Sequence, residues 1–203
     1  MMLKLIKNKD LIYDVLKYDV VLVSMNINNS MNKGFKYDIS LSFPDIRKKE
    51  METPYGDRRK YGTVLAIESN KTIFCICYMY EIPYNRKNKV DFVKYDALEK
   101  CLKDINNKFK GMKIASTVMG NDKYEGNGNY SRIMETFKKC CNDLDITLYD
   151  YQQTDRNTEF YKMGLTLLNE KRNKKISDSD YKEKHKRLES LRKNGFHPIN
   201  TLA

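Results

Sequence analysis

Two loops rich in asparagine and glycine are the segments of this chain whose residue types could do chemistry. The first loop, residues 26–35, reads NINNSMNKGF and follows the apolar run 20–23; the second loop, residues 119–129, reads MGNDKYEGNGN and follows the strand-like stretch 113–118. Glycine lets the backbone approach a ligand closely, and asparagine tolerates left-handed conformations. Backbone N–H groups in such loops, just before a helix, suit phosphate. Two loops of this kind could together hold a diphosphate.

Charged side chains in these loops add candidate roles. Asp122 and Glu125 are the carboxylates of the second loop, and either could act as a general acid or base, or both could simply be solvated. Lys33 and Lys123, one in each loop, could offset the charge of a diphosphate or lie exposed. Plain turns between strand and helix are the alternative interpretation of both loops. Neither loop has the GxxxxGK[ST] or GxGxxG pattern, which counts against the usual ATPases and dehydrogenases.

Cysteine and histidine usage argues against other kinds of site. The five cysteines include no CxxC pair, and the two histidines both lie beyond residue 180. Neither a zinc site nor a disulfide framework is indicated, and Ser–His or Cys–His nucleophilic arrangements are disfavoured. We therefore expect no metal, no cofactor, and reduced thiols that are mostly buried. These are Cys75, Cys77, Cys101, Cys140 and Cys141.

The elements that must position the loops follow from hydrophobic periodicity. The patterns predict strands at residues 3–7, 20–23, 62–68, 72–80, 113–119 and 146–151. They predict helices from Phe35 to before Pro44, over 91–109, and around Ile133–Cys141, with a charged loop over 47–60. Alternating strands and helices predict an α/β fold with a mostly parallel central sheet. Ligands in such sheets bind at the carboxyl ends of strands, which is where both loops begin.

The C-terminal part differs in character, so we expect two regions, 1–151 and a basic helical tail, 152–203. Thr154 or Asp155 could cap a helix that carries Phe160, Met163, Leu167 and Leu168. Residues 171–193 hold ten basic and four acidic residues, which fits either a solvated helix or an arm for RNA, DNA or a partner.

Composition sets the broad class. The net charge of +11 favours polyanionic partners, but free use of lysine, asparagine and tyrosine by an AT-rich genome, such as that of a phage or virus, would also produce it. No apolar run approaches the ~20 residues needed to cross a bilayer. We expect a cytoplasmic monomer with no membrane contact.

The order of four segments resembles the macrodomain family of ADP-ribose-binding α/β/α modules. The segments are NKDLI, VVLVSMNINNSMNKGF, KIASTVMGNDKYEGNG and IMETFKKCCNDLDITLYDY, which together cover about residues 3–151. The chain is most similar to the branch of phage and yeast ADP-ribose-1''-phosphate phosphatases and terminal ADP-ribose hydrolases. The resemblance implies a three-layer sandwich with a mixed central sheet.

The resemblance also implies roles for individual residues. Asp10, with Leu11 and Ile12, would bind adenine, and Asn26 would face the distal ribose as a catalytic candidate beside Asp122 and Glu125. The two phosphates would lie on the following backbone segments: Met31, Asn32, Lys33, Gly34 and Phe35 in the first loop, and Met119, Gly120, Asn121, Asp122, Lys123 and Tyr124 in the second.

The chain departs from the family pattern at several positions. Asn32 and Asp122 stand where the family keeps glycine, and Tyr130 stands where this branch usually has tryptophan. Related hydrolases that use a lysine nucleophile place it after the strand that here ends near Tyr80, and no lysine aligns there. The nearby basic residues are Arg86, Lys87 and Lys89.

Three functions therefore stay open. The chain could bind ADP-ribose or a derivative and hydrolyse it, releasing ADP-ribose from a modified macromolecule or phosphate from ADP-ribose 1''-phosphate. It could be a non-catalytic reader of ADP-ribose or adenine nucleotides. It could also bind RNA through its basic tail.

Overall fold

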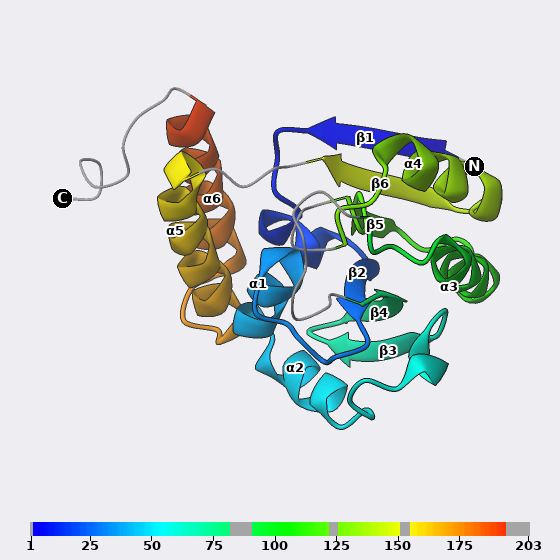
Figure 1. The fold of residues 1–203 in the computed structure, drawn as a ribbon. Helices are drawn as coiled ribbons and strands as arrows, with labels where there is room; N and C mark the ends of the chain where they lie inside the picture. The colour runs from blue at the N-terminus through cyan, green and yellow to red at the C-terminus, as the bar shows by residue number, and fades with distance from the viewer. Residues whose placement is uncertain (1, 82–90, 122–125, 151–154, 194–203) are drawn as a thin grey trace. The chain divides into compact units, whose positions relative to one another are not determined.

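The computed structural model describes residues 2–81, 91–121, 126–150 and 155–193, and the side chains of the last segment mainly from Met163 onward (Figure 1). The chain divides into two compact units, Met1–Tyr151 and Gln152–Ala203. Each unit is described by itself.

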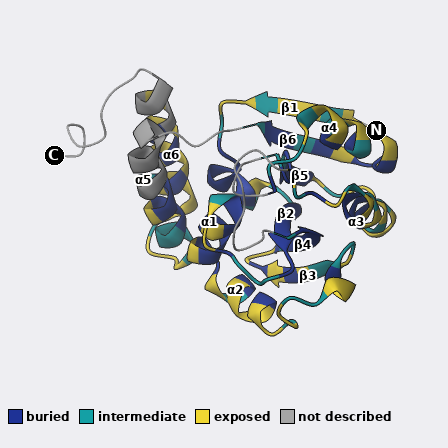
Figure 2. Ribbon diagram, in the orientation of Figure 1, coloured by how far each residue is buried: buried dark blue, intermediate teal, exposed yellow. Residues whose placement is uncertain are grey.

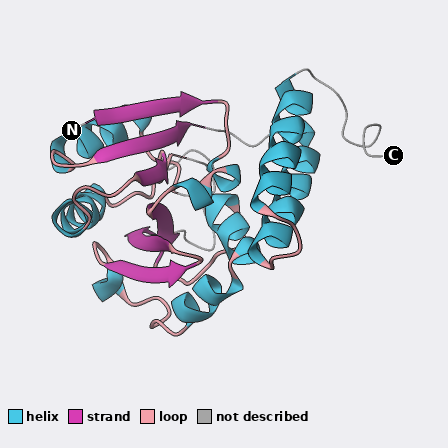
Figure 3. Ribbon diagram, turned by 180° about the vertical axis from the view of Figure 1, so that it is seen from behind, coloured by secondary structure: helices cyan, strands magenta, loops and turns pink. Residues whose placement is uncertain are grey.

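The first unit is built on a six-stranded sheet with the strand order β1-β6-β5-β2-β4-β3 (Figures 1 and 3). Its strands are β1 (Met2–Lys7), β2 (Val20–Asn26), β3 (Val64–Ser69), β4 (Thr72–Tyr80), β5 (Ile114–Thr117) and β6 (Asp145–Asp150). All neighbours run parallel except β3 and β4, which form an antiparallel pair at one edge. The mixed, mostly parallel sheet predicted from the sequence is confirmed.

Helices cover both faces of the sheet. Helices α1 (Gly34–Ser42) and α2 (Pro44–Met51) lie on one face, and α3 (Tyr95–Lys108) and α4 (Tyr130–Cys140) lie on the other (Figure 1). Three short 3-10 turns connect the elements: η1 (Leu11–Tyr13), η2 (Val15–Lys17) and η3 (Arg58–Lys60). The layers form the α/β/α sandwich that the sequence predicts.

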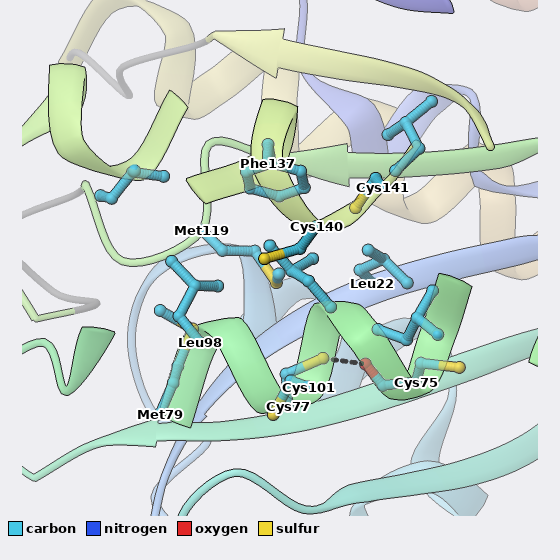
Figure 4. Packing of buried hydrophobic residues seen from close by; sticks show 14 of the residues in the cluster. Leu22, Cys75, Cys77, Met79, Leu98, Cys101, Met119, Phe137, Cys140 and Cys141 are labelled. Carbon is cyan, nitrogen blue, oxygen red and sulfur yellow. Dashed lines mark hydrogen bonds between the residues drawn. The ribbon is translucent and has the colours of Figure 1, made fainter. Parts of the chain in front are cut away.

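Strands β2 and β4 form the buried centre of the sheet (Figure 2). Every residue of β2 is buried, as expected for an apolar run with helices on both sides. On the side of α3 and α4, the core packs apolar side chains with the cysteines (Figure 4). All five cysteines are free and buried, as predicted. Burial raises the pKa of Cys75 and of Cys141 to about 12.

Two predicted boundaries are wrong. Residues 47–60 are not a loop, because α2 and η3 occupy most of them. Pro44 takes the first position of α2, which suits its fixed φ, and only Ile46 and Glu50 of this short helix are buried. The long helix begins at Tyr95 rather than at 91, because Val93 forms a bridge with Tyr80 at the sheet edge.

The second unit consists of α5 (Asp155–Arg172) and α6 (Asp178–Lys193), which pack against each other. Leu165, Leu167, Leu168, Tyr181 and Leu188 are buried. A turn at 173–177 separates the helices, so the basic segment 171–193 is not one continuous helix. None of the helices in the described part of the chain is both long enough and apolar enough to span a membrane.

Candidate functional site

The two Asn- and Gly-rich loops begin at adjoining carboxyl ends of the sheet. Strand β2 pairs with β5 on one side, with Leu22 beside Ser116, and with β4 on the other, with Asn26 beside Tyr80. Because these pairs are parallel, the first loop after β2 and the second loop after β5 leave the same edge. The sequence-based placement of both loops at this edge agrees with the topology.

Asn26 organises the first loop with its side chain. It is the last residue of β2 and only 3% exposed. Its Oδ1 accepts the N–H groups of Asn28 at 2.9 Å and Ser30 at 3.2 Å, and its Nδ2 donates to the Ser30 carbonyl at 3.0 Å. The amide therefore folds the loop back over the strand end. The ribose contact and the catalytic role implied for Asn26 stay predictions.

Helix α1 starts directly after the first loop. The helix begins at Gly34, whose φ of +67° is easily adopted only by glycine. Its N-cap residue is Lys33, an ammonium donor that cannot accept a hydrogen bond from the N–H groups of the first turn. A helix N-terminus without an accepting cap suits a phosphate or carboxylate.

A network of buried polar side chains holds the first loop in place. Asn29 adopts φ +51°, and its Nδ2 donates to the carbonyls of Glu50 at 3.3 Å and Thr53 at 2.8 Å. The Lys60 ammonium donates to the Ile27 carbonyl at 3.3 Å and also contacts Asn29 Oδ1. These contacts fix the loop backbone to the segment between α2 and β3.

Two titratable groups of this network are shifted by burial. Burial raises the pKa of Glu50, although Lys60 lies 3.8 Å away and opposes the shift. Burial likewise lowers the pKa of Lys60, with Glu50 opposing. Oε2 of Glu50 has no hydrogen-bond partner within the described residues. The network therefore holds the first loop in place, but the burial of its two charged groups is electrostatically unfavourable.

The second loop closes on itself through its backbone. Asn121 N donates to the Val118 carbonyl at 3.1 Å, and Gly128 N donates to the Gly120 carbonyl at 2.8 Å. A Cβ at Gly126 would lie 2.9 Å from Val93 Cγ2, and one at Gly128 only 2.7 Å from the same atom. Glycine at these two positions therefore allows the second loop to pack closely against Val93. Unlike α1, the next helix is capped, since Asn129 Oδ1 accepts Arg132 N at 3.0 Å.

The segment after β1 reaches the same edge of the sheet. Asp10 is 6% exposed and caps η1, accepting the Ile12 N–H on Oδ1 at 3.2 Å. Leu11 and Ile12 are buried, at 0% and 1% exposure, so the ligand contact implied for them stays a prediction. The adenine role implied for Asp10 stays a prediction.

A buried pair that the sequence patterns did not reveal lies where β4 ends. Lys36, in the first turn of α1, donates from Nζ to the Tyr80 hydroxyl at 2.7 Å. Both residues are inaccessible to solvent, at 1% and 0% exposure. Position 36 lies three residues before Ile39 and seven before Phe43, on the apolar stripe of α1. That spacing was the available signal for a buried lysine.

The remaining predicted residues fall into three groups. The side chains of Met31, Phe35 and Met119 are buried, whereas Asn32 and Lys33 are exposed. Asp122, Lys123, Tyr124 and Glu125 lie outside the described residues, as do Arg86, Lys87 and Lys89. Among the described residues there is no group of three or more His, Cys, Asp or Glu side chains that could hold a metal. A nucleic-acid role for the tail stays a prediction.

No protein-family model and no curated protein matches the chain. Solved structures do match it in fold. The macrodomain of Mycobacterium tuberculosis DarG superposes with a TM-score of 0.57 at 12% identity, covering 74% of this chain and 99% of that one. A Streptomyces coelicolor macrodomain protein gives 0.53 at 13% identity, covering 74% and 99%. Thermosipho africanus DarTG in complex with ADP-ribose gives 0.57 at 17% identity, covering 77% of this chain and 44% of that one. The chain thus shares its fold with macrodomains.

Proposed function

We propose that this chain binds ADP-ribose or a derivative across the carboxyl ends of β1, β2 and β5. The observation that carries the proposal is the pair of loops at adjoining strand ends, with α1 starting beyond the first loop from a residue that cannot cap it. One phosphate would lie on the N–H groups of 32–35 and the other on the second loop. The shared fold supports this assignment, because one protein with that fold was solved with ADP-ribose.

The proposed activity is hydrolysis of a bond at the distal ribose. The substrate would be an ADP-ribosylated macromolecule or ADP-ribose 1''-phosphate, and the products ADP-ribose with the released macromolecule or with phosphate. Such a reaction needs an oriented water or nucleophile and a ligand held firmly at its diphosphate. Asn26, Asp122 and Glu125 are the residues we propose for this step.

One observation favours a second candidate, a reader that binds without hydrolysis. Asn32 stands in the exposed part of the first loop, and its Oδ1 accepts the Ser30 hydroxyl at 2.7 Å. A fixed amide at this position would narrow the space beside the first phosphate-binding segment. ADP-ribose could then bind while the attacking group is kept away from the distal ribose.

Calorimetry with ADP-ribose tests binding, and AMP and adenosine serve as comparison ligands. Release of ADP-ribose or phosphate from ADP-ribosylated protein, ADP-ribosylated nucleic acid and ADP-ribose 1''-phosphate separates the hydrolase from the reader. We expect ADP-ribose to bind more tightly than AMP. A folded sample that binds no ADP-ribose derivative would refute the proposed function.

A further inference from the structure

Asn29 joins the first loop to the rest of the first unit through its side chain. Its φ of +51° lies in the left-handed region, which asparagine tolerates. Its Nδ2 donates to the carbonyls of Glu50 at 3.3 Å and Thr53 at 2.8 Å, and its Oδ1 accepts the Lys60 ammonium group. These partners lie 21 to 31 residues further along the chain. Both ends of the amide are therefore occupied by protein groups from outside the loop.

The turn at Asn70 shows a left-handed asparagine without such contacts. Asn70 adopts φ +52° between β3 and β4, and it is exposed. Its side chain makes no hydrogen bond to any residue in the described part of the chain. Backbone conformation alone accounts for asparagine at position 70, whereas at position 29 the side chain has a further role.

The turn at Asn29 lies just before the proposed phosphate-binding segment. The N–H groups of Asn28 and Ser30, on either side of it, donate to Asn26 Oδ1 at 2.9 Å and 3.2 Å. Met31 comes next and is buried, at 4% exposure, and the N–H groups at the start of α1 follow it. The turn therefore fixes the backbone path into that segment. A loop that is already ordered loses less conformational entropy when a ligand binds.

We infer that Asn29 is a positioning residue that keeps the first loop preformed for the diphosphate of the ligand. The inference deepens the proposed function and rests on it. Because its amide already bonds to protein groups, Asn29 acts through the backbone N–H groups that follow it. Without this anchor the loop would have to be ordered when the ligand binds, which lowers affinity and makes the binding entropy less favourable.

The first measurement compares Asn29→Gly with the matched variant Asn70→Gly. Glycine adopts positive φ at both positions, so each variant keeps the turn and loses only the side chain. ADP-ribose binding is measured by calorimetry at a temperature at which all three proteins are folded. Asn29→Gly should bind about tenfold more weakly than wild type and with a less favourable entropy, whereas Asn70→Gly should stay within about twofold of wild type.

The second measurement follows the loop itself with and without ligand. Hydrogen exchange of the Asn28 and Ser30 amides, measured by NMR, should be about tenfold faster in ligand-free Asn29→Gly and should slow again when ADP-ribose is bound. Exchange within β2 should not change, and Asn70→Gly should resemble wild type throughout. A purely structural role of Asn29 would lower the unfolding temperature without this local, ligand-sensitive change.

The outcomes separate the inference from the proposed function. If folded wild type binds no ADP-ribose, the proposed function fails and the inference fails with it. If wild type binds, the inference alone is overturned when folded Asn29→Gly keeps the wild-type affinity, or when its affinity falls and the exchange of Asn28 and Ser30 does not change. If Asn29→Gly does not fold, Asn29→Asp decides by the same measurements, because it loses the Nδ2 donor and keeps an acceptor for Lys60. If neither variant folds, Asn29 serves folding and the inference is wrong.

Discussion

The ammonium group of Lys60 lies 4.2 Å from the centre of the Tyr78 ring. The same group donates to the Ile27 carbonyl at 3.3 Å and to Thr53 Oγ1 at 2.9 Å, and Tyr78 donates its hydroxyl to Glu50 Oε1 at 3.2 Å. One lysine therefore links the first loop to α2, to β4 and to the segment before β3. The loop is held by a side chain distant in sequence, not only by its own turns.

Replacing Lys60 by methionine should destabilise the protein by about 3 kcal/mol, because it leaves the Glu50 carboxyl group buried without its cation. Urea unfolding followed by circular dichroism measures the change. Lys48→Met, an exposed lysine on α2, should change stability by less than about 0.5 kcal/mol. Equal small effects of the two variants would contradict the bracing role of Lys60.

The Asp14 carboxylate should stabilise the fold at neutral pH and lose this contribution in acid. It is 3% exposed, and burial alone would raise the pKa of its carboxyl group. Hydrogen bonds from Lys17, Lys9 and Tyr149 outweigh burial and hold the pKa below its ordinary value. A depressed folded-state pKa gives stability that is present above the unfolded pKa of about 3.9 and is lost as pH falls through the folded value.

Asp14→Asn should therefore lower stability by about 1–3 kcal/mol at pH 7, with the difference from wild type shrinking below about pH 4. Unfolding temperatures at pH 3, 4, 5 and 7 measure this for both proteins. If the difference in unfolding temperature between the two proteins stays constant over that pH range, the Asp14 carboxylate does not cause the loss of stability in acid.

The buried thiols predict slow modification in the native state. The pKa of Cys75 and of Cys141 is raised to about 12 by burial, so almost no thiolate forms at pH 8. Ellman's reagent should react with fewer than one thiol per chain within minutes at pH 8, and with all five after unfolding in guanidinium chloride. A rapidly reacting thiol in the native protein would show that the core beside α3 and α4 opens readily.

Much of the fold could be predicted because strands that are buried on both faces appear in the sequence as continuous apolar runs. The apolar run from Val20 and the stretch Thr72–Tyr80 indicate central strands. The two loops, which follow β2 and β5, are indicated by their glycine and asparagine content. Helix α2 was missed because its buried face consists of Ile46 and Glu50 alone, which is too short for a recognisable stripe.

The site could be predicted only in part, for a related reason. The positions of the loops follow from local sequence, but the contacts that hold them do not. Lys36 and Tyr80 are separated by 44 residues, and Lys60 and Asn29 by 31. A lysine is ordinarily exposed, so its burial can be predicted only when its hydrogen-bond partner is known. No pattern within one element supplies that partner.

Gly34 and Gly111 form a matched pair for testing the first loop. Both have positive φ, +67° and +78°, so alanine strains the backbone at either position by about 1–2 kcal/mol. A Cβ added at Gly111 would meet no atom of the described residues within 4 Å, and this glycine follows α3, away from the loops. Both variants should lose similar stability, and only Gly34→Ala should lose affinity for ADP-ribose. Equal affinities in calorimetry would move the ligand site away from the start of α1.

Substitution of Asn32 tests whether the chain hydrolyses its ligand or only binds it. If its side chain narrows the site, Asn32→Gly should raise the rate at which ADP-ribose or phosphate is released, or raise the affinity for ADP-ribose, by about tenfold, because glycine opens the space beside the phosphate-binding amides. Ser30→Ala is the matched control: it removes the 2.7 Å hydrogen bond to Asn32 Oδ1 but leaves the asparagine in place. A gain in Asn32→Gly alone assigns the effect to the side chain itself, whereas the same gain in both variants assigns it to the rigidity that the hydrogen bond imposes. If neither variant gains activity or affinity, Asn32 does not obstruct the site.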